Sequence, residues 1–391
     1  MAITGAATPG RRNATPVSFR LVNSALTRRT FLAAAAMAGC SRKLAKRYFG
    51  WLFVASATEK GVAVADLAEF RHATTIPLEH APVQVLRAGE RVFVTCPEAR
   101  TMIELDLAHF KSGRKLSLPG RIVSAAAHSD GRSLVVVTEE PSAICLVDAV
   151  SFRVKKQTLL PQRPAALAIS DSMAAVGSAD FITRISLPDC RVMGQSATGA
   201  ACGVVQFRKD GRMILAGLTE ARQIVTFDSA TGSLLARLPV ALPPARFTFS
   251  DNGQMFVTAA GDPNTPDSIA IVYPYQSEVD QTLIAGRTPY AMAVSEKRNL
   301  LLVTNPGSGD LTILDIDTRQ LAASVHVGGK PGEVLLTPDE EYALVISQDS
   351  GDVSVARMQT VLDRSVKTKP LFTVFPTGGN PQSAVIVPKE A

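Results

Sequence analysis

The sequence has few of the residues around which metal centres and disulfide scaffolds are built. Its 391 residues include five cysteines, five histidines and one tryptophan. No C-x-x-C pair, no C-x-x-C-H haem-attachment motif and no zinc-ligand spacing is present. A G-x-S-x-G, a phosphate-binding P-loop and a G-x-G-x-x-G in a suitable context are also missing. The sequence therefore predicts no metal site and no cofactor, and it shows no catalytic constellation.

Four of the cysteines lie in the body of the chain. Cys96 and Cys145 stand in strand-like patterns, where a cysteine typically behaves as a small buried hydrophobe. Cys190 and Cys202 are close enough in sequence to pair in an oxidising compartment, although no spacing demands it. Whether they form a disulfide stays open at this stage.

Acidic residues are absent from the first fifty positions, which carry nine Lys and Arg. Subtracting these nine from the 41 basic residues of the chain leaves 32, against 35 acidic ones. The basic pI near 9.1 therefore belongs to the N-terminal segment. The body is not a polyanion binder by charge, and no basic stripe interleaved with aromatic residues occurs in it. We expect no nucleic-acid partner.

No apolar run near the N-terminus is long enough to cross a bilayer as a helix. The nine residues from Phe31 to Gly39 fall short of the roughly twenty that a span needs. Arg28 and Arg29, followed by a Phe-Leu pair, resemble the twin-arginine export motif. The small residues that end in Cys40 resemble a lipobox, in which the cysteine is lipidated and becomes the mature N-terminus.

These resemblances imply that the N-terminal residues are a targeting signal and not a structured domain. We expect residues 1–40 to be a signal segment, residues 41–50 a basic tether, and residues 51–391 a single domain. The protein would then be periplasmic or on the cell surface, anchored to a membrane through acyl chains on Cys40. The alternatives are a disordered basic tail with a chance cysteine, and a translation start inside the long leader before Arg28.

The rest of the chain is a tandem repeat. Segments 285–319 and 327–357 share one order: turn, apolar strand, polar turn, apolar strand, Gly/Ser turn, alternating strand. Earlier copies recur back to Trp51, and the middles of their second strands are 40, 43, 39, 39, 42, 46 and 42 residues apart. A period of this length filled with four short strands predicts a β-propeller. The eight anchors are Val54, Val94, Val137, Val176, Leu215, Val257, Val303 and Val345.

Eight anchors predict an all-β, closed propeller of eight four-stranded blades. The weak copy at residues 171–188 leaves seven blades as the alternative. The chain begins with strands two and three of a blade and ends with a strand one near residues 377–387. In complete copies the anchor lies 14 residues after a proline, as from Pro289 to Val303, and from Pro381 that distance passes the last residue. We therefore expect the N- and C-terminal strands to pair and close the ring.

The copy at residues 328–357 reads G-x-x-P, then T-P-D-x-x-Y-x-L-V, a Gly turn and a strand, and the copy at residues 286–319 matches it best, with G-x-x-P and a final L-V in common. This pattern resembles the YVTN-type propeller repeats of bacterial surface and periplasmic proteins. Families that share the fold include lactonase-like propellers, the haem-d1 domain of nitrite reductases and amine-dehydrogenase propellers. The resemblance therefore implies a fold and not an activity. The Trp-Asp motif of another propeller class is absent.

In a propeller, the loops from strand four to strand one and from strand two to strand three lie on one face, around the channel. Their charges would converge on an anionic small molecule or an acidic partner. The alternative is a set of solvated loop charges, because the same face carries acids such as Glu98 and Glu139. The candidate ligand-binding residues are His80, Arg121, Arg163, Arg287, Lys330 and Asn380.

Three functions follow from these observations. We favour a monomeric, extracytoplasmic, membrane-anchored propeller that acts as a binding or scaffold module, with a protein partner or small ligand at the channel mouth. The alternative is a lactonase-like hydrolase, in which His80 with Arg163 or Arg287 polarises an ester. A haem or quinone redox propeller is a third reading. Whether the protein is an enzyme stays open.

Overall fold

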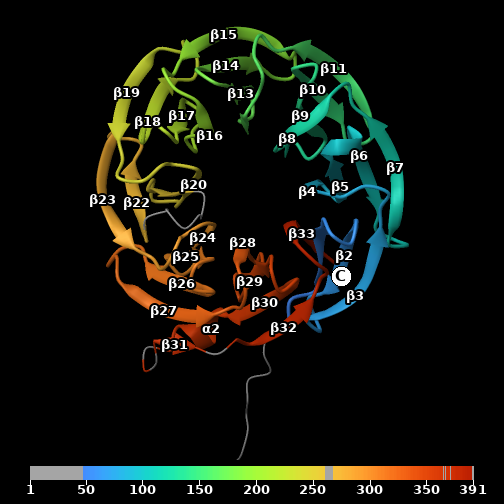
Figure 1. The fold of residues 1–391 in the computed structure, drawn as a ribbon, viewed down its shortest axis with the longest axis vertical. Coiled ribbons are helices and arrows are strands. Elements are labelled where there is room, and N and C mark those ends of the chain that lie inside the picture. Colours follow the sequence, from blue (N-terminus) through green and yellow to red (C-terminus); the bar gives the residue numbers. More distant parts are fainter. Residues whose placement is uncertain (1–46, 260–266, 364, 366, 370, 390–391) are drawn as a thin grey trace, which may run out of the picture. The chain divides into compact units, whose positions relative to one another are not determined.

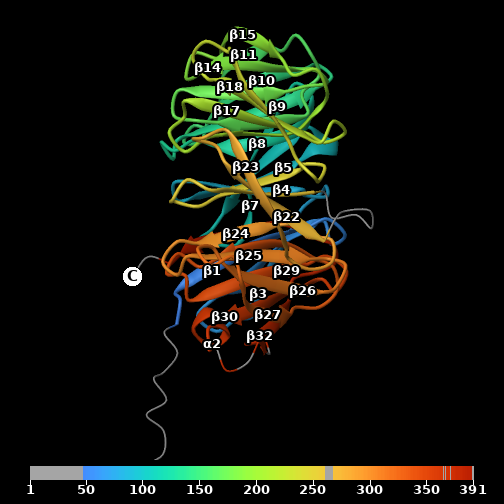
Figure 2. The ribbon, with the colours of Figure 1, turned by 90° about the vertical axis from the view of Figure 1, so that its left-hand side faces the viewer.

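The β-strands of this protein form eight sheets arranged around a central axis, as the computed structural model shows (Figures 1 and 2). The structure describes residues 47–259, 267–363, 365, 367–369 and 371–389. Arg28, Arg29 and Cys40 lie outside these residues, so the predicted signal stays a prediction. Within the described ranges, no helix has both the length and the apolar character needed to cross a bilayer.

Each sheet is a propeller blade, numbered here by its second strand in chain order. Blade 1 pairs the last strand of the chain with the first three. From the innermost strand outward, blades 1 to 4 are β33 (Pro381–Pro388), β1 (Gly50–Ser56), β2 (Gly61–Asp66) and β3 (Arg71–Pro77); β4 (Gln84–Ala88), β5 (Arg91–Cys96), β6 (Thr101–Asp106) and β7 (Lys111–Ser117); β8 (Arg121–Ala127), β9 (Ser133–Glu139), β10 (Ala143–Asp148) and β11 (Arg153–Leu159); β12 (Ala166–Ile169), β13 (Met173–Gly177), β14 (Phe181–Ser186) and β15 (Arg191–Ala197).

The second half of the ring continues in the same order. Blades 5 to 8 are β16 (Cys202–Phe207), β17 (Met213–Leu218), β18 (Gln223–Asp228) and β19 (Leu234–Pro239); β20 (Arg246–Phe249), β21 (Met255–Thr258), β22 (Ser268–Tyr273) and β23 (Glu278–Ile284); β24 (Met292–Ser295), β25 (Leu300–Asn305), β26 (Asp310–Asp315) and β27 (Leu321–His326); β28 (Pro331–Leu336), β29 (Tyr342–Ser347), β30 (Asp352–Arg357) and β32 (Thr373–Pro376). A short 3-10 helix, η1 (Pro97–Ala99), follows β5.

The predicted blade count of eight is confirmed, and the alternative of seven is wrong. Each anchor falls in the second strand of its blade, from Val54 in β1 to Val345 in β29. The weak copy forms the complete sheet β12 to β15, whose second strand is fully buried. Its signal is weak because small residues such as Ala174 and Ala175 replace the larger aliphatic residues of other copies.

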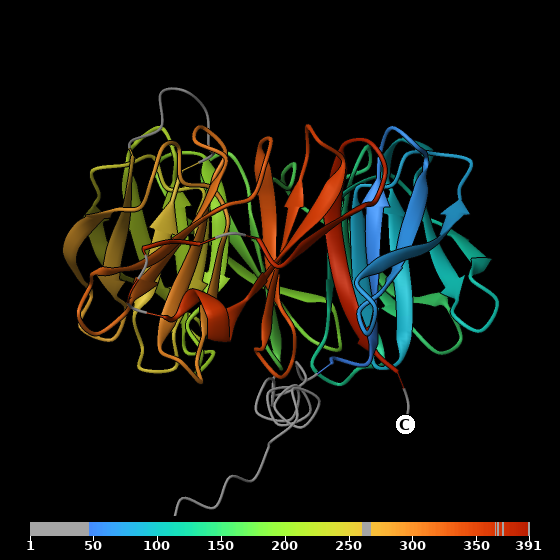
Figure 3. The ribbon, with the colours of Figure 1, turned by 90° about the horizontal axis from the view of Figure 1, so that it is seen from below.

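The ring closes through the two ends of the chain, as the sequence predicts. Strand β1 lies between β2 and β33, and Val54 pairs with Ala63 on one side and Ala384 on the other. Figure 3 shows β33 beside β1, at the two ends of the colour scale. The pairing gives the backbone amides of β1 partners on both edges, so the seam leaves no open edge there. Tyr48 is already buried, so the propeller begins before the expected start at Trp51.

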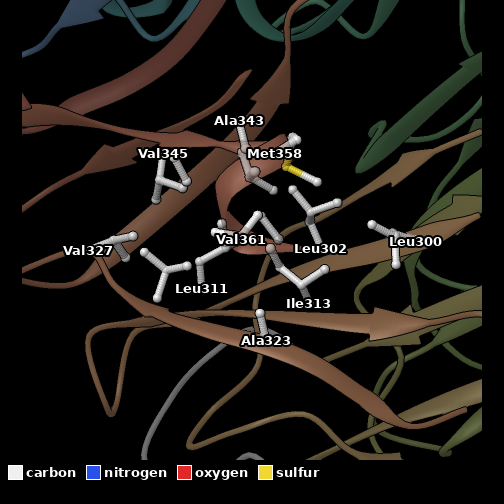
Figure 4. Packing of buried hydrophobic residues seen from close by; sticks show 14 residues of the cluster. Leu300, Leu302, Leu311, Ile313, Ala323, Val327, Ala343, Val345, Met358 and Val361 are labelled. Atoms are coloured by element: carbon white, nitrogen blue, oxygen red, sulfur yellow. The ribbon is translucent and has the colours of Figure 1, made fainter. Parts of the chain in front are cut away.

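Blade 7 departs from the four-stranded pattern. The segment between β30 and β32 contains a one-turn helix, α2 (Met358–Val361), and a two-residue strand, β31 (Thr368–Lys369). Strand β31 adds a fifth, parallel strand to the outer edge of β27. Met358 and Val361 are buried against Leu302 and Ile313 of blade 7 (Figure 4). A strand of two residues has no periodicity, so the sequence pattern could not reveal it.

The faces of the blades are buried between neighbouring blades, which explains the apolar second and third strands. Between the first two blades, Phe53 and Val64 of blade 1 pack with Val94 and Ile103 of blade 2. Burying one such aliphatic or aromatic side chain contributes roughly 1.5–3 kcal/mol. The inner and outer strands are more exposed, because one edge of each faces the channel or the solvent.

The apolar cluster between blades 1 and 2 predicts a large loss of stability on replacing Phe53 by alanine. The Phe53 side chain is 0% exposed, so its removal should lower the free energy of unfolding by about 3–5 kcal/mol. Phe49, which is 64% exposed just before β1, supplies the control, and Phe49→Ala should change it by less than about 0.5 kcal/mol. Urea denaturation followed by far-UV circular dichroism measures both. Equal losses in the two variants would contradict the packing described here.

Candidate functional site at the channel mouth

A cavity of about 670 Å³ is lined by residues from all eight blades. We call it the mouth cavity. The innermost strands of the blades surround the axis of the ring (Figure 1). Concave sites of this size that mix apolar walls with a few polar groups are typical of small-molecule binding. The lining residues are Val83, Gln84, Val123, Ser124, Ala165, Ala166, Leu167, Gly203, Val204, Val205, Ala245, Arg246, Tyr290, Ala291, Glu333, Gln348, Gln382 and Ser383.

The mouth cavity opens on the face that the sequence predicts for ligand sites. Apart from Gln348, its lining residues lie just before the inner strands or within their first four positions, near the loops from the preceding outer strands. Gln348 follows β29 directly, and so lies on a loop from strand two to strand three. Both kinds of loop belong to the same face of a propeller.

The polar lining follows one rule of the repeat. In several blades the residue two positions after the opening proline contributes a polar side chain to the cavity. In three of these blades the side chain forms a hydrogen bond with a backbone group in the inner strand of the next blade, and in the fourth it forms one with the Tyr290 hydroxyl. The polar residues at this position are Gln84, Arg246, Glu333 and Ser383.

Arg246 is the cation of the cavity. Its guanidinium stacks 4.0 Å from the centre of the Tyr290 ring and donates a hydrogen bond to the Tyr290 hydroxyl. Stacking of this kind holds the planar group in one orientation while its remaining N–H donors stay available. Arg246 is exposed to the cavity, and no carboxylate of the described chain lies within ion-pairing distance of it.

Glu333 is the carboxyl group of the cavity. It is half-buried, and its Oε2 accepts a hydrogen bond of 2.9 Å from the backbone N–H of Ala384 in β33. Burial raises the pKa of Glu333 to about 7, against the opposing effects of the Ala384 N–H, the Arg246 charge and a hydrogen bond from Ser383. The group therefore exchanges its proton near neutral pH.

Two of the predicted ligand-binding residues, Arg121 and Arg163, lie close together because both bind the carboxylate of Glu139. Arg121 and Arg163 both donate to Glu139, which is only 3% exposed. Arg121 also reaches Glu98 at 3.2 Å. The hydrogen bonds from Arg163 and Arg121 hold the pKa of Glu139 below its usual range, although desolvation opposes them. Both guanidinium groups therefore serve an ion triad between blades and do not line the cavity.

The other predicted residues stay apart on exposed rim loops. His80, Arg287, Lys330 and Asn380 each lie in a loop from an outer strand to the next inner strand, and none lines the cavity. The Asn380 carboxamide accepts a hydrogen bond of 2.7 Å from Gln382. The face is as predicted, but the groups that converge there come from inner strands.

Sequence reasoning missed Arg246, Glu333 and Tyr290, although a signal existed. The first strand of each copy consists mainly of small apolar residues, and a charge two positions after the proline interrupts that pattern. Arg246 follows Pro244 and Glu333 follows Pro331 at this spacing. A charge placed at the crowded axis of a propeller points to the channel.

Cysteine and metal chemistry have little structural support in the described chain. Cys96, Cys145, Cys190 and Cys202 are free and buried, so Cys190 and Cys202 do not pair. Desolvation raises the pKa of Cys96 to about 11 and that of Cys145 to about 12, which disfavours the reactive thiolates. Among the described residues no group of three or more His, Cys, Asp or Glu is arranged to hold a metal ion.

Comparison with known proteins supports the fold. No family model matches the chain, and no curated protein is significantly similar to it. The dihydro-heme d1 dehydrogenase NirN, solved in complex with DHE, is similar with a TM-score of 0.72 and 14% identity over 86% of this chain and 74% of that one. Hydrazine synthase of Kuenenia stuttgartiensis is similar with a TM-score of 0.56 and 19% identity over 71% of this chain and 95% of that one. At these identities the likeness shows the fold alone, a β-propeller.

The raised pKa of Glu333 predicts a pH-dependent stability. In the unfolded chain this carboxyl titrates near 4.5, whereas in the folded protein it keeps its proton up to about 7. Through this group the folded state binds more protons between these values, so the contribution of Glu333 to stability should fall as the pH rises from about 4.5 to 7. The glutamine of Glu333→Gln does not titrate, so the melting temperature of this variant minus that of the wild type should increase over this pH range. Paired melting curves at pH 5 and pH 7.5 measure the gain, and a constant difference would contradict the assignment.

Proposed function

We propose that this protein is a binding propeller that holds a small anionic ligand in the mouth cavity, with Arg246 as the anion-binding residue. The observation that carries the proposal is a guanidinium oriented by Tyr290 inside a cavity lined by all eight blades. A guanidinium offers forked donors that match carboxylate or phosphate oxygens. The amides of Gln84, Gln348 and Gln382 add donors and acceptors around it.

The contrast with the other cations supports Arg246. Arg121 and Arg163 already donate to Glu139, so their charge is compensated within the protein. Arg287 and Lys330 are exposed on rim loops, where water screens an ion pair and leaves it worth roughly 0–1 kcal/mol. Arg246 combines a defined orientation with a cavity wall, which strengthens a charge-assisted hydrogen bond.

The hydrolase alternative has less support. His80 is exposed on a rim loop, Arg163 donates a hydrogen bond to Glu139, and neither residue lines the cavity. The structural neighbour NirN was solved with DHE, but no lining residue of the mouth cavity described here is His, Cys or Met. The cavity thus offers no His, Cys or Met to a haem iron, and the hydroxyl of Tyr290 already accepts a hydrogen bond from Arg246, so we propose an organic anion instead.

Replacing Arg246 by glutamine should weaken anion binding roughly tenfold to a hundredfold, because a charged hydrogen-bond donor is lost. The control is Arg287→Gln, which removes an exposed rim charge of the same type and should leave the affinity within about twofold. Isothermal titration with succinate, benzoate and inorganic phosphate measures the change. If wild type binds none of these anions, or if Arg246→Gln binds them as tightly, the proposal is wrong.

We further propose that the propeller is exported and tethered to a membrane through lipid on Cys40. The support is the order of Arg28, Arg29, the short apolar run and Cys40 in the sequence, together with a propeller that begins by Tyr48. We also propose that the repeats are a divergent form of the YVTN type and that the protein works as a single ring. A protein partner at the same mouth remains the second reading of the binding role.

Replacing Cys40 by serine should abolish acylation and release the protein from the membrane fraction. Two acyl signals or more hold a protein firmly, since each buried methylene contributes about 0.8 kcal/mol. Intact mass and membrane fractionation of the full chain report the effect. The paired control Arg28→Lys with Arg29→Lys should instead leave an unexported, unprocessed precursor. An unmodified Cys40 in the wild-type protein would refute the anchor.

A further inference from the structure

Glu333 occupies a position where other blades use neutral side chains for the same structural task. Its Oε2 accepts from the Ala384 N–H of the next blade at 2.9 Å. At the same repeat position, Ser383 Oγ accepts from the Val85 N–H at 3.4 Å, and Gln84 Nε2 donates to the Ala125 carbonyl at 3.0 Å. Bridging two inner strands therefore requires no ionisable group.

A carboxyl group at this position has a cost that serine and glutamine avoid. Desolvation disfavours its charged form, and burying a charge without a partner is more costly than burying a neutral amide. The cavity also contains the Arg246 cation, which neither contacts Glu333 as an ion pair nor has another acidic partner in the described chain. The cavity thus holds one cation and one ionisable carboxyl, each able to take an opposite charge.

We propose that the mouth cavity selects a zwitterion, whose anionic group binds Arg246 and whose cationic nitrogen binds the carboxylate of Glu333. The inference rests on the proposed function, since Arg246 remains the anion-binding residue. The two groups stand on blades 6 and 8, and blade 7, which carries Tyr290, is the blade between these two in the ring. Amino acids and ω-amino acids have this chemistry.

The sign of the pH dependence separates a zwitterion from a simple anion. As the pH rises through the titration of Glu333, a carboxylate appears in the cavity. It attracts a ligand nitrogen that stays protonated, and it repels a ligand that carries only negative charge. Other charged or titratable groups on the elements around Glu333 include Arg246 at the start of β20, Tyr290 before β24, Lys330 before β28, Tyr342 at the start of β29 and Asp349 after β29.

The test compares ω-amino acids from glycine to 6-aminohexanoate with the matched acids from acetate to hexanoate, by isothermal titration of the full chain at pH 6 and pH 8. We expect at least one amino acid to bind roughly tenfold or more tightly than its matched acid at pH 8. Its affinity should rise from pH 6 to pH 8, while that of the acid falls. Glu333→Gln can still accept from the Ala384 N–H through its amide oxygen and should remove both trends.

The outcomes distinguish the two proposals. If the acids bind through Arg246 but no amino acid exceeds its matched acid at pH 8, the zwitterion inference is overturned and the anion site stands. If neither series binds at either pH, both are overturned. The opposite pH trends of the wild-type protein decide the inference even if Glu333→Gln folds poorly.

Discussion

The pairing of β33 with β1 turns a row of eight sheets into a ring. Without this seam, the inner edge of β1 would be an unpaired strand edge, and blade 1 would lack its innermost strand. Closure also sets the width of the channel, because the eight inner strands must share one axis. The seam further explains why strands two and three read as nearly continuous apolar runs, since every blade has a neighbour on both faces.

The same closure creates the chemistry of the mouth cavity. Inner strands converge at the axis but do not pair with one another, so some of their backbone N–H and C=O groups face the channel. Side chains two positions after the opening proline satisfy several of these groups across the gap between blades. Where that position carries Arg246 or Glu333, the structural bridge becomes a charge in a shared cavity. Under the proposed function, ligand recognition would therefore depend on the two blades that carry a charged residue at this bridging position.

The rim and the cavity differ in how they use charge. On the rim, Arg121 and Arg163 enclose the buried carboxylate of Glu139, and this triad joins neighbouring loops. A buried carboxylate with two guanidinium partners is satisfied, so these cations have little left to offer a ligand. Inside the cavity the single guanidinium stacks on an aromatic ring and has no such acid. Counting cations on a face thus says less about binding than asking which of them already has a partner.

Eight blades, with seven as the alternative, could be predicted from the repeats, as could the second strand of each blade and the closure of the ring. Those features repeat every forty residues or so and depend on local alternation, turns and the position of proline, all of which are readable along the chain. The sequence could not predict which charges meet. Arg163 and Glu139 are 24 residues apart, and Arg246 and Tyr290 belong to different blades, so only the packing of blades brings each pair into contact. The fifth strand of blade 7 is likewise set by the docking of α2 and not by any local pattern.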